Sequence, residues 1–132
     1  SMHTTLKLTA ATLMSLAVAA APAAATALYS WTPAVQLSEA GEPAWSPDVA
    51  YSADGSAVMV WGRQDGTRWV AEAVRRNADG TLGTTRTLAS SDEPLLGPRA
   101  AIDAHGNALL TWTRWDGSNW RVQARTLPAG GG

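Results

Sequence analysis

An internal repeat of about 50 residues constrains this chain more than any other feature of its sequence. Residues 36–81 align with residues 87–132 without a gap, at a shift of 51 residues, and 16 of the 46 aligned positions are identical. The clearest match joins Trp61–Trp69 to Trp112–Trp120, where Trp, Arg, Asp-Gly and Trp recur in the same places. Such a repeat predicts two copies of one supersecondary unit, neither of which can bury its apolar surface alone.

Each copy has the pattern of short antiparallel strands separated by turns. Asp65-Gly66, between two apolar runs, predicts a tight type I′ hairpin, whose two central residues both need a positive φ. In the last strand, apolar and polar residues alternate, so one face is expected to be buried and the other wet. Ser90–Pro98 is interpreted as a polar connection between the copies. The expected strands are Asp48–Ala53, Ser56–Arg63, Arg68–Arg76, Thr84–Ala89, Arg99–Ala104, Asn107–Arg114 and Asn119–Leu127.

Four antiparallel strands per repeat, with Gly and aromatic residues at the turns, are typical of a β-propeller blade. The second copy ends after its third strand, and Trp31–Leu37 aligns with the fourth strand of the first copy. We therefore predict an all-β fold of two four-stranded antiparallel blades, 39–89 and 90–132, with an N-terminal outer strand in 28–38 completing the last blade.

The number of blades leaves the architecture open. A closed propeller needs at least about four blades, so two blades predict either assembly of several copies or a piece of a longer protein. Oligomerisation into a closed ring is our main expectation. A compact sandwich of eight strands in two sheets is the alternative fold.

The N-terminal segment predicts export. The apolar run Leu8–Ala21 is followed by Ala25-Thr26-Ala27, the small-x-small pattern of a signal-peptidase site. We predict that residues 1–27 are a secretory signal peptide cleaved before Leu28, with Ser1 a cloning remnant, and that the mature protein is extracellular. The apolar run is shorter than the ~20 residues of a membrane span, and a chain without Cys cannot carry a lipoprotein anchor. No membrane association is expected after cleavage.

Residues suited to catalysis or metal binding are scarce. The one His beyond the leader, His105, takes the place of Asp54 before a turn Gly, so we expect a turn residue facing water. The sequence has no Cys, no Gly-x-Ser-x-Gly elbow and no ligand spacing of a zinc or calcium site. Ten basic residues against eleven acidic ones do not make the basic surface typical of nucleic-acid binding. We predict a non-enzymatic protein without metal, cofactor or nucleic-acid partner.

The seven tryptophans are the better guide to function. An aromatic ring presents a broad apolar face on which a sugar can stack, while Arg and Asp offer hydrogen bonds to hydroxyl groups. The two Asp-Gly hairpins combine these residue types. The candidate carbohydrate-binding residues are Arg63, Asp65, Trp69, Arg114, Trp115, Asp116 and Trp120.

Packing between blades is the competing explanation for the repeated tryptophans. Trp61 and Trp112 occupy equivalent positions, and we expect both to be core residues; Trp69 and Trp120 share this explanation. Trp115 differs, because its counterpart is Gln64 and it lies beside the turn. We therefore expect Trp115 to be exposed and to contribute to a ligand surface.

The segment Trp115–Trp120, which reads Trp-Asp-Gly-Ser-Asn-Trp, resembles the Trp-Asp-Gly-x-x-Trp hairpin of the small bacterial and fungal fucose-binding propeller lectins. The resemblance covers the hairpin, the two-repeat plan and the size. It implies a lectin-like module in which two-repeat chains assemble, six blades from three chains being the first expectation, with four from two and eight from four left open. The Glu that this family places shortly before the hairpin is here Trp61 or Trp112, so fucose itself is not implied.

Two other functions stay open at this point. One is an architectural or protein-binding propeller segment without a sugar site. The other is a fragment of a larger propeller enzyme whose catalytic residues lie on blades outside this sequence. Neither is distinguished from a lectin by the motifs above.

Overall fold

The computed structural model describes Met2, residues 15–21 and residues 30–130. The chain divides into two units, residues 1–33 and residues 34–132. In the first unit, the described residues have no regular secondary structure, and most of the predicted signal peptide, with its cleavage before Leu28, lies outside the described residues. Within the described part of the chain, no helix is long and apolar enough to cross a membrane.

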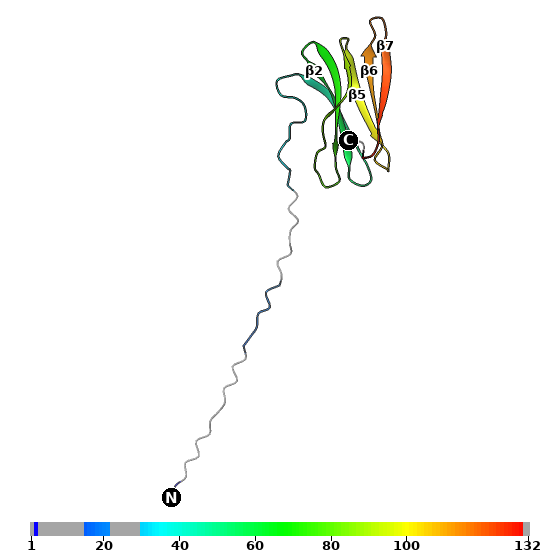
Figure 1. Ribbon diagram of the computed structural model, residues 1–132. Coiled ribbons are helices and arrows are strands. Elements are labelled where there is room, and N and C mark those ends of the chain that lie inside the picture. Colours follow the sequence, from blue (N-terminus) through cyan, green and yellow to red (C-terminus); the bar gives the residue numbers. More distant parts are fainter. Residues whose placement is uncertain (1, 3–14, 22–29, 131–132) are drawn as a thin grey trace. The chain divides into compact units, whose positions relative to one another are not determined.

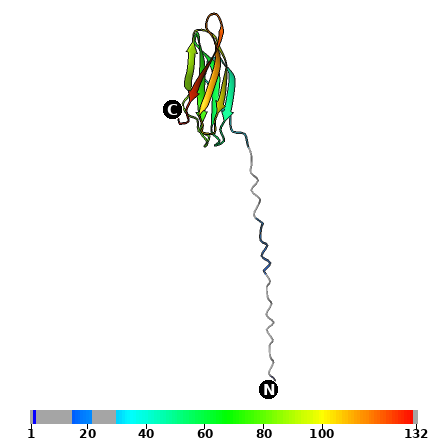
Figure 2. The ribbon, with the colours of Figure 1, turned by 90° about the vertical axis from the view of Figure 1, so that its right-hand side faces the viewer.

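The second unit consists of two antiparallel β-sheets, seen from two sides in Figure 1 and Figure 2. The first sheet has the order β1-β2-β3-β4 and the second has the order β5-β6-β7. The all-β prediction is therefore confirmed. The strands are β1 (Ala44–Tyr51), β2 (Ala57–Asp65), β3 (Arg68–Arg76), β4 (Arg86–Ser91), β5 (Leu95–Ile102), β6 (Ala108–Trp115) and β7 (Trp120–Leu127).

Strands β1 and β5 begin earlier than the sequence predicts, because each continues through a proline. The pairing of β1 with β2 shifts around Pro47, and the pairing of β5 with β6 shifts around Pro98. At these bulges Ser46 has a φ of 48° and Gly97 a φ of 58°. A bulge leaves one residue unpaired, which is where a strand tolerates the missing N–H of proline. The predicted connection Ser90–Pro98 is therefore wrong at both ends, because Ser90 and Ser91 belong to β4 and its last four residues belong to β5.

The hairpin between β2 and β3 is tight, but its turn differs from the predicted type I′. Asp65 pairs with Arg68, so the two loop residues are Gly66 and Thr67. Gly66 has a φ of 60°, and Asp65 is not among the residues with positive φ. A glycine at the first central position alone is the pattern of a type II′ turn. Gly117, with a φ of 97°, takes the equivalent place in the hairpin between β6 and β7.

The two sheets have the same internal register. The β1–β2 pair Ala50↔Val58 recurs 51 residues later as the β5–β6 pair Ala101↔Leu109, and the two bulges also correspond. The pairing of β2 with β3 recurs in the same way between β6 and β7. The repeated sequence therefore builds the same three-stranded unit twice.

The hydrophobic core lies between the two sheets, where β5 packs on β1 and β2. Polar contacts also join the sheets: the Ala100 backbone N–H donates to Asp48 at 2.9 Å, and Arg114 Nε donates to Ser91 Oγ at 2.9 Å. We call the core-facing side of each sheet its inner face. The buried core residues are Val58, Val60, Ala71, Ala73 and Leu88 from the first sheet, and Leu95, Ala108, Leu110 and Trp112 from the second.

The predicted N-terminal strand, Trp31–Leu37, is not formed within this chain. Residues 30–37 have no strand structure, and β7 is the last strand of its sheet. Gln36 and Leu37 instead line a hollow with Trp61. Because side chains alternate along a strand and Val60 faces the core, Trp61 belongs to the other side of the first sheet. Gln36 and Leu37 therefore lie against the first sheet and not beside β7 of their own chain.

Candidate functional site

The tip of the β6–β7 hairpin carries two tryptophans side by side. Trp115 pairs directly with Trp120, and their rings meet edge to face with centroids 5.4 Å apart and an interplanar angle of 62°. Trp120 is 48% exposed, whereas Trp115 is partly buried. We expected Trp115 to be the exposed ring and Trp120 to share the packing role. That assignment is reversed, because the cross-strand contact covers part of Trp115.

Asp116 holds the turn of this hairpin in place. Its carboxylate accepts hydrogen bonds from the backbone N–H groups of Ser118 at 2.9 Å and Asn119 at 2.7 Å, and from Arg121 Nε at 2.6 Å. The hydrogen bond from Arg121, with those from the two backbone groups, lowers the pKa of Asp116 to about 2. The carboxylate is therefore occupied by its own hairpin, and it positions Arg121 rather than acting as a free acceptor.

The equivalent hairpin between β2 and β3 is built differently at the same positions. Trp69 pairs with Gln64 instead of a second tryptophan, and its ring contacts Trp45 edge to face with centroids 5.2 Å apart. Trp69 is half-buried and packs against the core. Its role here is packing, which was the competing explanation for this candidate.

Trp61 and Trp112 are both buried, as predicted. Trp112 belongs to the core between the sheets, whereas Trp61 is buried on the outer side of the first sheet beside Leu37. The indole N–H of Trp61 donates to Glu72 Oε2 at 3.1 Å, and that of Trp112 donates to Gln123 Oε1 at 3.0 Å. Glu72 and Gln123 occupy equivalent positions in the repeat. Sequence inspection missed both acceptors, although the register of a short hairpin places each directly opposite its tryptophan.

The remaining candidates do not join the Trp115–Trp120 tip. Arg63 Nε donates to Glu72 Oε1 at 2.8 Å and its Nη2 lies 3.8 Å from Asp65, so these residues form a group on the first sheet. Arg114 points to the opposite side of its strand from Trp115 and binds Ser91 between the sheets. Of the seven candidates, the structure brings together Trp115, Asp116 and Trp120.

The structure gives no sign of metal or His chemistry in its described part. No group of three or more His, Cys, Asp or Glu side chains there could hold a metal ion. His105 is exposed in the β5–β6 turn, where its backbone N–H donates to Asp103 Oδ1 at 2.9 Å. It is the turn residue facing water that the sequence predicts.

Comparisons of the chain with protein-family models, with curated proteins and with solved structures found no match.

Proposed function

We propose that this chain is a secreted, non-enzymatic β-propeller module, that copies of it close into a ring, and that the ring binds carbohydrate at the Trp115–Trp120 tip. One observation carries the assembly. The two sheet faces that point away from the core are the repeat equivalents of the two faces that pack on it, and each of them carries exposed apolar side chains.

The free face of the second sheet corresponds to the inner face of the first sheet. Val58 is fully buried, and its equivalent Leu109 is 49% exposed; Ala71 is fully buried, and its equivalent Val122 is 78% exposed. Exposed apolar side chains that follow a packing pattern mark an interaction surface. The free face of the second sheet therefore has the same apolar pattern as the inner face of the first sheet. Within the chain, that inner face packs on the second sheet.

The outer side of the first sheet, which carries Trp61, corresponds in turn to the inner face of the second sheet. Ala100 and Ile102 pack against the core, and their equivalents Val49 and Tyr51 are exposed. One copy can thus place its first sheet on the second sheet of another copy by the contact that joins the two sheets within a chain. Such a heterologous contact repeats from copy to copy, and it closes into a ring where the rotation allows.

The N-terminal segment supports the same arrangement. Leu37 lines the hollow with Trp61, just as its repeat equivalent Leu88 shares the core cluster with Trp112. Residues 36–38 therefore lie where the outer strand of a preceding blade would lie. In the ring, the preceding blade is the second sheet of the neighbouring copy, whose strand β7 has a free edge. The segment would then complete that sheet from the next subunit, which also protects the edge from unwanted strand pairing.

Carbohydrate binding is supported by the Trp115–Trp120 pair. Trp120 offers an exposed ring face, an apolar platform on which a sugar can stack. Asp116 and Arg121 brace the same hairpin at 2.6 Å, and alternation along β7 places Arg121 on the other side of the strand from Trp120. The resemblance to propeller lectins involves this hairpin, and the first hairpin has Gln64 in place of the second tryptophan. We therefore expect this kind of sugar site once per chain.

Light scattering on residues 28–132 tests the ring, and we expect a mass of several chains. Val122→Asp should give a folded monomer, because it places a charge on the free face without touching the core. Thr67→Asp, at an exposed turn residue, is the matched control and should still assemble. A wild-type monomer at micromolar concentration would contradict the ring.

A glycan array on the same protein tests the sugar site, and assembly without glycan binding would favour the architectural alternative.

A further inference from the structure

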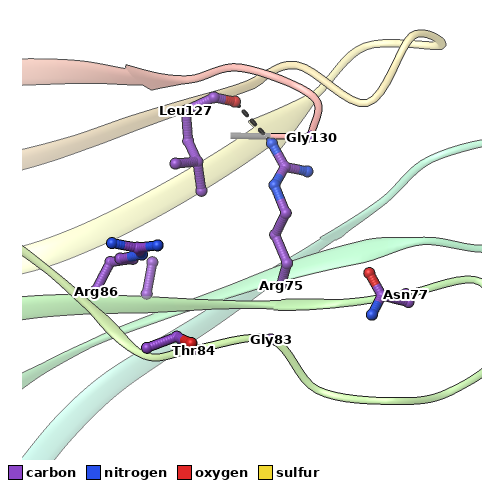
Figure 3. A pocket seen from close by; sticks show the side chains of 8 residues that line it. Arg75, Asn77, Gly83, Thr84, Arg86, Leu127 and Gly130 are labelled. Atoms are coloured by element: carbon purple, nitrogen blue, oxygen red, sulfur yellow. Dashed lines mark hydrogen bonds between the residues drawn. The ribbon is translucent and has the colours of Figure 1, made fainter. Parts of the chain in front are cut away.

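A cavity of about 320 Å³ opens at the edge of the interface between the two sheets (Figure 3). It lies between the end of β3 and the start of β4 on one side and the end of β7 on the other. Its volume is at the lower end of the ~300–1,000 Å³ range of small-molecule sites. Arg75, Asn77, Thr84 and Arg86 give it polar walls, so it is separate in place and chemistry from the Trp115–Trp120 tip.

Arg75 is held across the mouth of this cavity. Its Nη2 donates to the backbone oxygens of Leu127 at 2.7 Å and Pro128 at 2.9 Å, a contact visible in Figure 3 for Leu127. Its Nε is buried and has no hydrogen-bond partner among the described residues. A guanidinium has five N–H donors, so the two carbonyl contacts fix its position and leave donors unused. A buried donor without a partner is costly, which favours a ligand that supplies an acceptor.

Arg86 brings a second positive charge to the same cavity. It pairs with Ala73 in the first sheet, so it extends from the side of the sheet that faces the core. In the described part of the chain, Arg86 forms no salt bridge, and no carboxylate lines the cavity. Two guanidinium groups without a counter-charge repel each other, and an anion placed between them would offset this repulsion.

The second copy does not repeat these arginines. The equivalent of Arg75 is Thr126, and the equivalent of Arg86 is Val35. Thr126 lies on the outer side of β7 and Val35 in a segment without strand structure, so neither position faces another sheet within the chain. The two positive charges belong to the interface within a chain, which gives one such cavity per chain.

We propose that the cavity between Arg75 and Arg86 binds the carboxylate or sulfate group of an acidic sugar. Guanidinium groups make strong, charge-assisted hydrogen bonds to such oxygens, while the Thr84 hydroxyl and the Asn77 amide oxygen can bind ring hydroxyls. The sugar part of this proposal rests on the proposed carbohydrate function; the anion site does not.

The test is calorimetric titration of the secreted protein with three ligands: glucuronate, glucose 6-sulfate and glucose. Binding of glucuronate or glucose 6-sulfate, with glucose at least tenfold weaker, is expected, and the tighter of the two anions identifies the group. Arg86→Gln should weaken the anionic ligand about tenfold or more, the loss expected for a charged hydrogen bond. Arg99→Gln, an exposed arginine outside the cavity, is the matched control and should bind as the wild type does.

The outcomes separate this site from the Trp115–Trp120 tip. Trp120→Ala should leave the affinity for the anionic ligand unchanged. A failure of glycan binding at the Trp115–Trp120 tip would therefore not count against anion binding in the cavity. The proposal is overturned if neither anion binds, if glucose binds equally well, or if Arg86→Gln has no effect. It is also overturned if Trp120→Ala, rather than Arg86→Gln, removes binding of the anionic sugars.

Discussion

The two sheets share one register and differ in what covers them. In the first sheet, Val58 packs against the second sheet, and Trp61, on the opposite side, is buried beside Leu37. In the second sheet, Trp112 is buried in the core, while Leu109 on the opposite side is half exposed. The repeated sequence therefore determines the strand pairing, and the neighbours of each sheet determine which repeated positions are buried. A residue's repeat position alone does not say whether it packs or faces solvent.

The largest difference in stability should be found between tryptophan substitutions on the two faces of the second sheet. Trp112→Ala removes a buried ring and its hydrogen bond to Gln123, and should lower the free energy of unfolding by about 3–5 kcal/mol. Trp120→Ala, on the free face, should change it by less than about 1 kcal/mol in the monomer. Chemical denaturation of both variants in the Val122→Asp background measures this. Equal losses would mean that the second sheet is covered on both sides.

The acceptors opposite the buried tryptophans should also differ between the sheets. Glu72 accepts hydrogen bonds from both Trp61 and Arg63. Glu72→Ala leaves the indole N–H and a mostly buried guanidinium without an acceptor, and should lower the free energy of unfolding by about 3 kcal/mol. Gln123→Ala removes a single neutral hydrogen bond, which is worth about 1 kcal/mol. Denaturant melts of the two variants give the comparison directly.

Glu72→Gln is the informative control for this pair, because the second sheet already has glutamine at that position. It keeps an acceptor for Trp61 and loses only the charge that faces Arg63, so it should cost less than Glu72→Ala. If Glu72→Gln and Glu72→Ala cost the same, the charge on Glu72 rather than the hydrogen bond to Trp61 holds this group together.

The two equivalent leucines of the outer segments should also differ in their contribution to stability. Leu88→Ala, in the core of strand β4, should cost about 2–5 kcal/mol. Leu37→Ala, at the equivalent position beside Trp61, should cost about 1 kcal/mol in the monomer, because Leu37 is only half-buried. In the proposed ring, Leu37→Ala should also weaken assembly, which sedimentation at several concentrations measures. Unchanged assembly of Leu37→Ala would mean that the N-terminal segment is not part of the interface between copies.

Much of the fold could be predicted from the sequence, because alternation and turn residues are local signals. The bounds of β3 match the predicted Arg68–Arg76, and the gapless repeat implies the shared register. The bulges at Pro47 and Pro98 could not be predicted, since a proline at a bulge and a proline that ends a strand look the same. Trp31–Leu37 forms no strand within the single chain. Whether a terminal strand completes a sheet of its own chain or of the next subunit depends on which edge is within reach, and no local signal specifies it.

The candidate site was predicted less well, because its residues depend on side-chain direction. Arg114 and Trp115 are neighbours in sequence, yet alternation along β6 puts them on opposite sides of the sheet. Glu72 was not among the candidate residues, and only the strand register places it opposite Trp61. The cavity between Arg75 and Arg86 is lined by residues of β3, β4 and the end of β7. These segments are far apart in the sequence, and no residue spacing predicts that they lie together.

The smallest expected effect concerns pH at the tip of the β6–β7 hairpin. Asp116 has a folded-state pKa of about 2, below the ordinary value of 3.8, chiefly because of the hydrogen bond from Arg121. A carboxyl group with a lowered pKa contributes stability that is fully present above its unfolded pKa and is lost as the pH falls through the folded value. The indole NMR signal of Trp120 in the folded protein should therefore stay constant from pH 7 to about pH 3 and change around pH 2, the folded-state pKa of Asp116. Asp116→Asn should abolish this transition, and Arg121→Gln should move it toward pH 3.8, the ordinary pKa of an aspartate. A transition that survives Asp116→Asn would show that another carboxylate controls the hairpin tip.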